Sequence, residues 1–417
     1  MTLKSFALAV LLYAPVIAQA PDLAQLSAMN YVIVSPEGPK DGGDFGPNTP
    51  DTKTSGIQEA FDFAKANRKD VYIAGGTMPD KFKNGVVYHI EETIRIPWFQ
   101  DFRLDGGEYV INLDKNTGDA IVIDSQMSCR FKFGLIVAPT DGAVVRIKPE
   151  TKGPDDFIVT TASTFEFNAI VGGGSVFDDG KKAPLGSGLV LDASLGPIVY
   201  NKFYATEMIA CDVGLQMTCG PEGNDKSVVA MNSFEIPFLH LCKTHMQIGD
   251  GKAHVAGNTF DVTIDGGGVE GARGMRLFGK DNLFTLRIAN IPAGNGVIFE
   301  GPAERNKINM IYPASGYTNN AAKPTNVIVP QVSTGFGIET PPVPASSEAL
   351  VNRTPFNVEV MVTSPGAVSG WTLTDLNGVP QVFDGNWSAG QSIPLAPGES
   401  LNVNYTALPA WRWRGSN

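Results

Sequence analysis

Short apolar runs separated by turn residues make up most of this chain. Residues 71–73 and 102–104 are followed closely by paired glycines, and residues 94–96 stop at Pro97. This pattern is typical of short β-strands. Residues 55–67 differ, because their apolar side chains recur at helical spacing behind the capping-box pattern Ser55-Gly56-Ile57-Gln58. The hydrophobic pattern therefore predicts an all-β protein with one short helix near its start.

The later part of the chain repeats a two-strand pattern. One strand of each copy begins with a small residue or His, at Gly188, Gly214, His245, Gly274 and Gly296. The other begins with Asn, any residue, and then Phe or Ile. The Asn positions are 31, 26, 24 and 24 residues apart, at Asn201, Asn232, Asn258, Asn282 and Asn306. Two interleaved columns whose spacing varies from copy to copy predict stacked coils joined by loops of different lengths.

This period predicts a parallel β-helix. A coil of roughly 22 to 31 residues that holds two or three short strands and no helix is what that fold requires. Leucine-rich repeats have a similar period, but they need several leucines at fixed offsets, whereas the column here is Asn. Stacked Asn amides would hydrogen-bond from coil to coil. The aromatic rings two residues later would fill the core, at Phe203, Phe234, Phe260 and Phe284.

The N-terminal part of the chain carries a resemblance to a known superfamily. The segments concerned are residues 51–52, 57–60, 71–76, 94–97 and 104–107. They resemble the start of the pectate-lyase-like right-handed parallel β-helix superfamily, and the resemblance spans about residues 30–330. It implies a solenoid capped by a short helix and a carbohydrate-active protein, with a homotrimer as one possible assembly. It leaves the reaction open, because this superfamily holds hydrolases, lyases, epimerases, fructan transferases and adhesins.

The chain divides into four predicted parts. Residues 1–20 read as a signal peptide, with Lys4 before an apolar run and small residues Ala18 and Ala20 at its end, so we expect a secreted, extracellular protein. The β-helix domain is assigned to residues 21–340, a proline-rich linker to 341–350, and a small β-sandwich-like domain to 351–417. Three tryptophans of the last domain could either form a sugar-stacking surface or pack against the solenoid or a neighbouring subunit, Trp387, Trp411 and Trp413.

Composition and net charge limit the classes of binding partner. The chain is 43% hydrophobic and 18% charged, which favours a large core over disorder. Its formal net charge of −11 disfavours nucleic acid and anionic membranes as partners. The sequence contains no Cys-x-x-Cys or His-x-x-x-His spacing, and we expect no cofactor.

Two covalent features can be placed from spacing. Cys211 and Cys242 each lie ten residues after their column Asn, so we expect them at equivalent places on adjacent coils, as a disulfide or a stacked thiol pair. Three Asn-x-Ser/Thr sequons predict an exposed, glycosylated C-terminal end if the host is eukaryotic, at Asn352, Asn386 and Asn404.

The candidate site follows from the period-two alternation of strands. If the column phenylalanines point inward, the residues after them face outward, which stacks Glu235 directly on Asp261. Strands ~4.8 Å apart would bring these carboxyls near the ~5 to 5.5 Å separation of a retaining glycosidase pair. One of two such close carboxyls should hold a proton and serve as general acid. The predicted substrate-binding residues are Asp265, Arg287, Arg276 and Gln247. A purely structural role remains the alternative, because the outward face of any solenoid is polar.

Three functions are therefore carried forward. The first is a secreted glycoside hydrolase or transglycosylase that uses Glu235 and Asp261 on a poly- or oligosaccharide. The second is a polysaccharide lyase acting on a uronate polymer by β-elimination, assisted by calcium or by Arg and Lys. His240, Lys243 and His245 are weaker candidates for its base, on a predicted turn between strands. The third is a non-catalytic, trimeric glycan-binding or adhesion protein.

Overall fold

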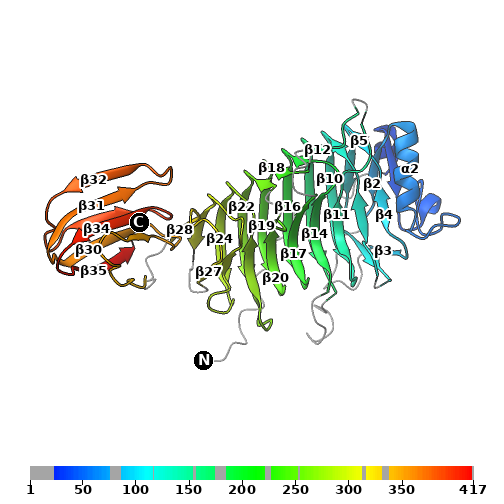
Figure 1. Cartoon of the computed structure of the whole chain (residues 1–417). Helices are drawn as coiled ribbons and strands as arrows, with labels where there is room; N and C mark the ends of the chain where they lie inside the picture. The colour runs from blue at the N-terminus through cyan, green and yellow to red at the C-terminus, as the bar shows by residue number, and fades with distance from the viewer. Residues whose placement is uncertain are drawn as a thin grey trace.

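The computed structural model describes residues 23–75, 86–115, 117–153, 156–173, 185–220, 227–251, 254–311, 316–330 and 338–415. The predicted signal peptide, residues 1–20, lies outside these ranges. Within them the chain forms an elongated stack of parallel strands followed by a smaller antiparallel unit (Figure 1). No helix among the described residues is long and apolar enough to span a membrane.

The stack is a right-handed parallel β-helix with three sheets, as predicted. Sheet A has 13 strands: β1 (Tyr31–Val34), β2 (Asp70–Ile73), β6 (Arg103–Gly106), β10 (Arg130–Val137), β13 (Thr164–Val171), β16 (Lys202–Ile209), β19 (Ser233–His240), β22 (Thr259–Asp265), β24 (Leu283–Ala289), β26 (Lys307–Ile311) and β28 (Val327–Pro330), with β3 (Val86–Ile90) and β7 (Tyr109–Leu113) at its side.

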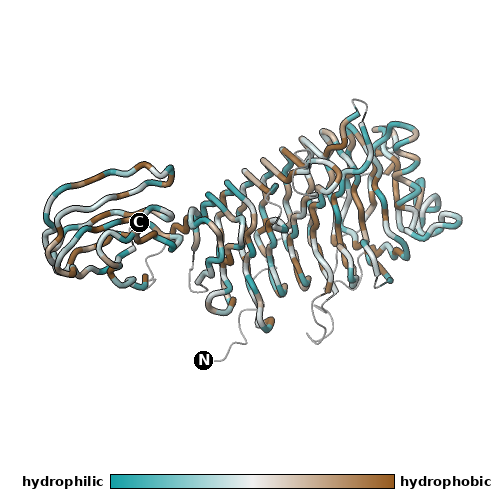
Figure 2. Tube along the Cα trace, in the orientation of Figure 1, coloured by the Kyte–Doolittle hydropathy of each residue, from teal (hydrophilic) through white to brown (hydrophobic). Residues whose placement is uncertain are grey.

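Sheets B and C complete each coil. Sheet B contains β4 (Ile94–Ile96), β8 (Ile121–Ile123), β11 (Ala143–Ile147), β14 (Ser187–Ala193), β17 (Val213–Cys219), β20 (Thr244–Ile248), β23 (Arg273–Leu277), β25 (Val297–Phe299) and β27 (Tyr317–Asn319). Sheet C contains β5 (Phe99–Gln100), β9 (Gln126–Met127), β12 (Thr160–Thr161), β15 (Ile198–Val199), β18 (Val229–Ala230) and β21 (Val255–Ala256). Apolar and polar stretches alternate along the coils (Figure 2), because alternate side chains point into and out of the solenoid.

Short helices lie at the N-terminal end. They are α1 (Leu23–Ala28), the 3-10 helix η1 (Gly38–Lys40) and α2 (Ile57–Asn67). α2 covers the first coil (Figure 1) and buries the residues that gave its helical pattern, Ile57, Ala60, Phe61 and Ala64. The predicted capping box is wrong. Gly56 occupies the N-cap position in a left-handed conformation, and Ser55 instead donates a hydrogen bond to the His89 carbonyl.

Two ladders run through the solenoid and confirm the predicted register. The rings of Phe203, Phe234, Phe260 and Phe284 stack inside one core with centroids 4.7, 4.7 and 4.5 Å apart. The column Asn residues are buried, and each side-chain amide donates to the amide oxygen of the next coil at 2.8 to 3.1 Å. The ladder continues to Asn326, a member that the sequence pattern did not include.

Cys211 and Cys242 lie at equivalent corners of neighbouring coils, as predicted. Both are fully buried and free, so the structure has the thiol pair and not the disulfide. The hydrogen bond between the two thiols, together with burial, holds the pKa of Cys211 well above its usual value. A thiol that resists ionisation is a poor nucleophile, which argues for a structural role.

We expect the native protein to be almost inert toward a thiol-specific disulfide reagent. All four cysteines are buried thiols that form no disulfide in the structure, and the thiolate is the reactive form, so both access and ionisation are limited. After denaturation, all four thiols should titrate, with or without prior reduction. If only Cys129 and Cys219 titrate before reduction, the Cys211–Cys242 pair is a disulfide in the isolated protein.

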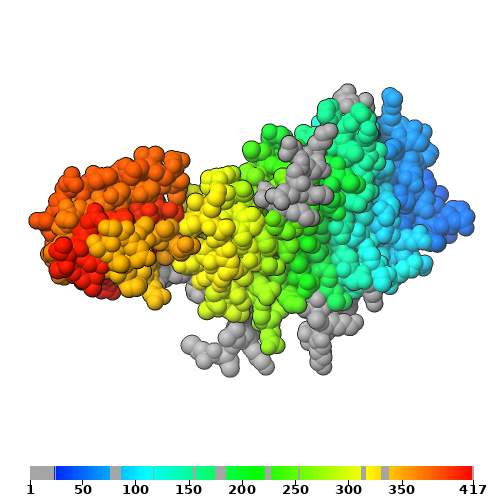
Figure 3. Space-filling view, viewed as in Figure 1, coloured from blue at the N-terminus to red at the C-terminus, as the bar shows by residue number. Residues whose placement is uncertain are grey.

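The C-terminal unit is a small β-sandwich, as predicted. One sheet contains β29 (Ala349–Val351), β34 (Ser400–Tyr405), β31 (Val368–Thr374) and β32 (Pro380–Asp384), and the other contains β33 (Ser392–Leu395), β30 (Val358–Ser364) and β35 (Ala410–Gly415). The unit touches the last coils of the solenoid (Figure 3). At that contact, Ile328 N donates to the Pro355 carbonyl at 2.6 Å. The rings of Tyr317 and Phe356 pack edge to face with their centroids 5.4 Å apart.

The proline-rich segment is packed against this sandwich. Trp411 Nε1 donates to the Pro341 carbonyl at 2.9 Å, and the Tyr405 hydroxyl donates to the Pro344 carbonyl at 2.7 Å. Strand β29 begins at Ala349, inside the predicted linker of residues 341–350. The segment is therefore held along its length and is not a free spacer.

Two expectations for the C-terminal domain are wrong. Trp387, Trp411 and Trp413 are only 3, 7 and 4% exposed, so they form the sandwich core and not a sugar-stacking surface. Asn352 is fully buried, and its amide donates to the carbonyls of Phe356 and Leu395. A buried amide cannot accept a glycan without unfolding its surroundings. The other two sequon residues are exposed and stay predictions, Asn386 and Asn404.

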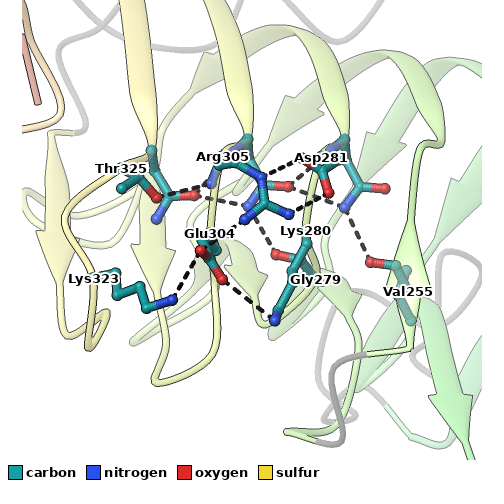
Figure 4. Close-up of polar contacts among 11 residues, drawn as sticks. Val255, Gly279, Lys280, Asp281, Glu304, Arg305, Lys323 and Thr325 are labelled. Atoms are coloured by element: carbon teal, nitrogen blue, oxygen red, sulfur yellow. Dashed lines mark hydrogen bonds and ion pairs between the residues drawn. The ribbon is translucent and has the colours of Figure 1, made fainter. Parts of the chain in front are cut away.

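A charged network ties the last coils together (Figure 4). Glu304 is 13% exposed and contacts Arg305 at 2.7 Å, Lys323 at 3.2 Å and Lys280 at 3.3 Å. Arg305 also binds both carboxylate oxygens of Asp281. Burial acts to raise the pKa of Glu304, but the bonds from the lysines and the charge of Arg305 outweigh it, so the pKa is lowered.

We expect this network to make stability depend on acidity. Because the pKa of Glu304 is lower in the folded state, its contribution is fully present above the pKa of an unfolded glutamate and is lost as pH falls through the folded value. The free energies of unfolding of the wild type and of Glu304→Gln, measured with urea, should converge as pH falls from 6 toward about 3. The exposed Glu348→Gln is the matched control and should follow the wild type at every pH. A constant gap between Glu304→Gln and wild type would contradict the linkage.

Candidate functional site

The predicted outward row exists on sheet A. Tyr204, Glu235, Asp261 and Thr285 are direct partners across β16, β19, β22 and β24. The side chains of Glu235 and Asp261, called here the acid pair, are both exposed. The period-two argument therefore placed the pair on the correct face and in the correct register.

The two carboxylates of the acid pair have different surroundings. Arg287 Nη1 donates to Asp261 Oδ1 at 2.6 Å, reaching back diagonally from β24. Among the described residues, Glu235 has no ion pair or side-chain hydrogen bond. One carboxylate is thus held by a guanidinium while its neighbour is free to meet a ligand. This brings together three of the predicted site residues.

A β-bulge reshapes the same face beyond the acid pair. The register between β19 and β22 shifts between Ile236 and Leu239, so β19 carries one more residue there than β22 does. Pro237 lies within this bulge. Beyond it, His240 lies directly beside Asp265.

Three polar side chains and one aromatic ring gather at the bulge, and we call them the histidine cluster: Glu207, His240, Asp265 and Phe238. His240 Nε2 lies 2.7 Å from Glu207 Oε1, and its ring packs on Phe238 with centroids 4.0 Å apart. Asp265 Oδ1 accepts hydrogen bonds from the Asn290 amide and from Gly267 N. A half-buried imidazole that is oriented by a carboxylate is suited to proton transfer.

The structure corrects the placement of the other basic candidates. His240 ends strand β19 and does not lie on a turn. His245 lies in β20, fully buried, with each ring nitrogen close to a backbone carbonyl. Burial lowers the pKa of His245. The same burial keeps its ring from reaching a polymer on the surface. Lys243 lies 3.6 Å from Asp212.

Arg276 and Gln247 lie away from the acid pair. They are direct partners on the outward face of sheet B, in β23 and β20. Arg276 also binds Glu300 at 2.8 to 2.9 Å and lies over the Phe278 ring. The structure therefore does not bring these two predicted substrate-binding residues onto the face that carries Glu235 and Asp261.

The described residues show no metal centre at this face. No group of three or more His, Cys, Asp or Glu side chains among them could hold a metal ion. Two cavities, of about 370 and 300 Å³, lie elsewhere on the described residues. The acid pair sits on an open sheet face, which suits a long ligand better than a small enclosed one.

Comparisons with known proteins bear on the fold and not on the activity. No protein-family model matches the sequence, and no curated protein matches it. The chain is similar in structure to the Dettilon tailspike protein, at 12% identity with a TM-score of 0.35, covering 90% of this chain and 94% of that one. It is also similar to a double mutant of the tailspike protein of E. coli bacteriophage HK620, at 10% identity with a TM-score of 0.21, covering 94% and 93%. The β-helix assignment depends on the coils themselves and not on these distant likenesses.

Proposed function

We propose that this protein is a secreted glycoside hydrolase or transglycosylase that acts on a poly- or oligosaccharide lying across the outer face of sheet A. One observation carries the proposal: Glu235 and Asp261 are exposed, directly paired residues on neighbouring strands. Strands ~4.8 Å apart suit the ~5 to 5.5 Å separation of the carboxyls in a retaining glycosidase.

The surroundings of the two carboxylates suggest their roles. Glu235, which has no partner among the described residues, donates a proton to the leaving oxygen. Asp261, held by Arg287, attacks the sugar carbon or stabilises the positive charge that develops there. Water or a second sugar hydroxyl, deprotonated by Glu235, then takes the glycosyl group. The choice of acceptor separates a hydrolase from a transglycosylase.

Neighbouring groups would bind the rest of the substrate. Arg287 and Asp265 border the acid pair on the same face and offer a donor and an acceptor for sugar hydroxyls. Tyr204 is 37% exposed beside Glu235 and offers an aromatic face. The apolar leader at residues 1–20 supports export. Light scattering of the purified chain would show whether the protein is a homotrimer.

The test is a panel of polysaccharides and oligosaccharides incubated with the purified protein. We expect new reducing ends, or longer products if the acceptor is a sugar. Binding of a glycan without any product would favour the third function, a non-catalytic adhesion protein. No binding and no product across the panel would contradict the proposal.

A polysaccharide lyase is the second candidate, and the histidine cluster favours it. A lyase removes the proton at C5 of a uronate, and His240, oriented by Glu207, could take that proton. The product would be an unsaturated uronide, which absorbs ultraviolet light, whereas hydrolysis gives no such product. Loss of activity in His240→Gln with retention in Glu235→Gln would favour the lyase.

A further inference from the structure

One cavity lies in the C-terminal sandwich. It has a volume of about 370 Å³ and opens between the two sheets. Leu373 of β31 and Gln381 of β32 line one wall, and Pro394 and Leu395 of β33 line the other. This volume falls within the range of small-ligand sites in proteins.

The cavity lies beside strand β32, which is an edge strand of its four-stranded sheet. Gln381 pairs with Leu373, which pairs in turn with the buried Leu401, so this side of β32 faces the sandwich interior. All five residues of β32 are nevertheless exposed. Phe383, on the same side, is covered only in part by Trp371, whose ring stacks on it at 5.3 Å. The inner side of β32 is therefore an uncovered wall with a cleft beneath it.

The lining of this cleft suits a neutral, polyhydroxylated ligand. The amides of Asn357 and Gln381 have no hydrogen-bond partner among the described residues. The carboxylates of Asp375 and Glu399 accept backbone N–H groups of their own turns. No cation lines the cleft, so an anionic sugar acid would meet only like charge. Leucine and proline side chains at the walls offer an apolar surface to the C–H face of a sugar ring.

The cleft is fixed in its orientation relative to the solenoid. Gly398, next to Glu399 at one end of the cleft, approaches the last coil so closely that a Cβ there would lie 3.2 Å from Pro324 O. The Asn319 amide also donates to the Arg353 carbonyl at 2.9 Å. A polymer bound at both the cleft and the solenoid would gain affinity from the fixed spacing of the two sites.

We propose that this cleft is a second glycan-binding site, which takes a neutral saccharide unit independently of the acid pair. The full chain carrying Glu235→Gln and Asp261→Asn is screened on an array of neutral and acidic oligosaccharides, and the strongest neutral ligand is titrated by calorimetry. We expect a neutral ligand to bind. Combining Gln381→Ala with Asn357→Ala should weaken it about 10-fold, as loss of two neutral hydrogen bonds does. Both residues are exposed, so the variant should fold.

The matched control is Val382→Ala, on the same strand but on its opposite side and 69% exposed. It should bind as the parent does. Binding of acidic oligosaccharides alone, or equal affinity of the cleft variant and the parent, would overturn the proposal. The absence of any bound glycan would overturn it too. Cleavage by the wild type is measured separately, so failure at the cleft leaves the acid-pair proposal standing and the reverse also holds.

Discussion

Glu235→Gln and Asp261→Asn are each expected to lower the turnover of sugar cleavage by on the order of 10² or more, the usual effect of losing a positioned acid, base or nucleophile. Both side chains are exposed on an outward face, so neither change should disturb folding. The amides keep the size of the carboxyls but cannot donate a proton as an acid or attack as an anion. Initial rates of reducing-end release on one substrate, with circular dichroism to verify folding, provide the measurement.

The matched control is Glu166→Gln. Glu166 lies in the same outward row, two coils before Glu235. Tyr204 lies between them and pairs with both. It shares the strand environment of the acid pair but contacts Arg130 instead. Its variant should cleave at nearly the wild-type rate. Near-normal cleavage by both acid-pair variants would remove Glu235 and Asp261 from the mechanism and leave the histidine cluster as the candidate on this face.

The ladders were predictable because every coil repeats the same local pattern. A column of equal residues fixes which positions are neighbours in space, and the alternation of strand side chains then fixes the face. This is why the stacking of Phe234 on Phe260 and of Glu235 on Asp261 follows from residue numbers alone. The same logic placed Cys211 beside Cys242, but it could not decide between thiols and a disulfide.

The histidine cluster was missed because its contacts are not between equivalent positions. Glu207 lies six residues after its column Asn, whereas His240 lies eight after its own. Their side chains meet diagonally. His240 meets Asp265 only because the bulge in β19 adds a residue before it. Such an insertion changes the register locally, and a regular period cannot show it.

The errors in the C-terminal domain have a different origin. Trp387, Trp411 and Trp413 were open to sugar stacking or to packing on the solenoid or a neighbouring subunit, because aromatic residue type alone does not tell which side of a strand faces the core. The alternation of Trp411 and Trp413 with Arg412 and Arg414 was a usable signal, because it is the pattern of a strand with one buried face. Asn352 gave no comparable signal, since its burial depends on the distant Leu395 carbonyl.

Asn258→Ala is expected to lower the free energy of unfolding by about 3 to 5 kcal/mol. Asn258 is fully buried, and its amide donates to the Val229 carbonyl and to Asn282 Oδ1, each at 3.0 Å. Its own oxygen accepts from the backbone and side-chain nitrogens of Asn232. Removing this amide leaves several buried donors and acceptors unpaired, and each unpaired group costs about 1 to 3 kcal/mol.

Urea unfolding followed by circular dichroism measures the loss, and Asn168→Ala serves as the control because Asn168 is exposed on the outer face of sheet A. That variant should stay within about 0.5 kcal/mol of wild type. The comparison separates the buried ladder from the general effect of replacing an asparagine in a strand or corner. If Asn258→Ala unfolds as the control does, the amide ladder does not hold neighbouring coils together, and the aromatic stack at Phe234 and Phe260 must account for their cohesion.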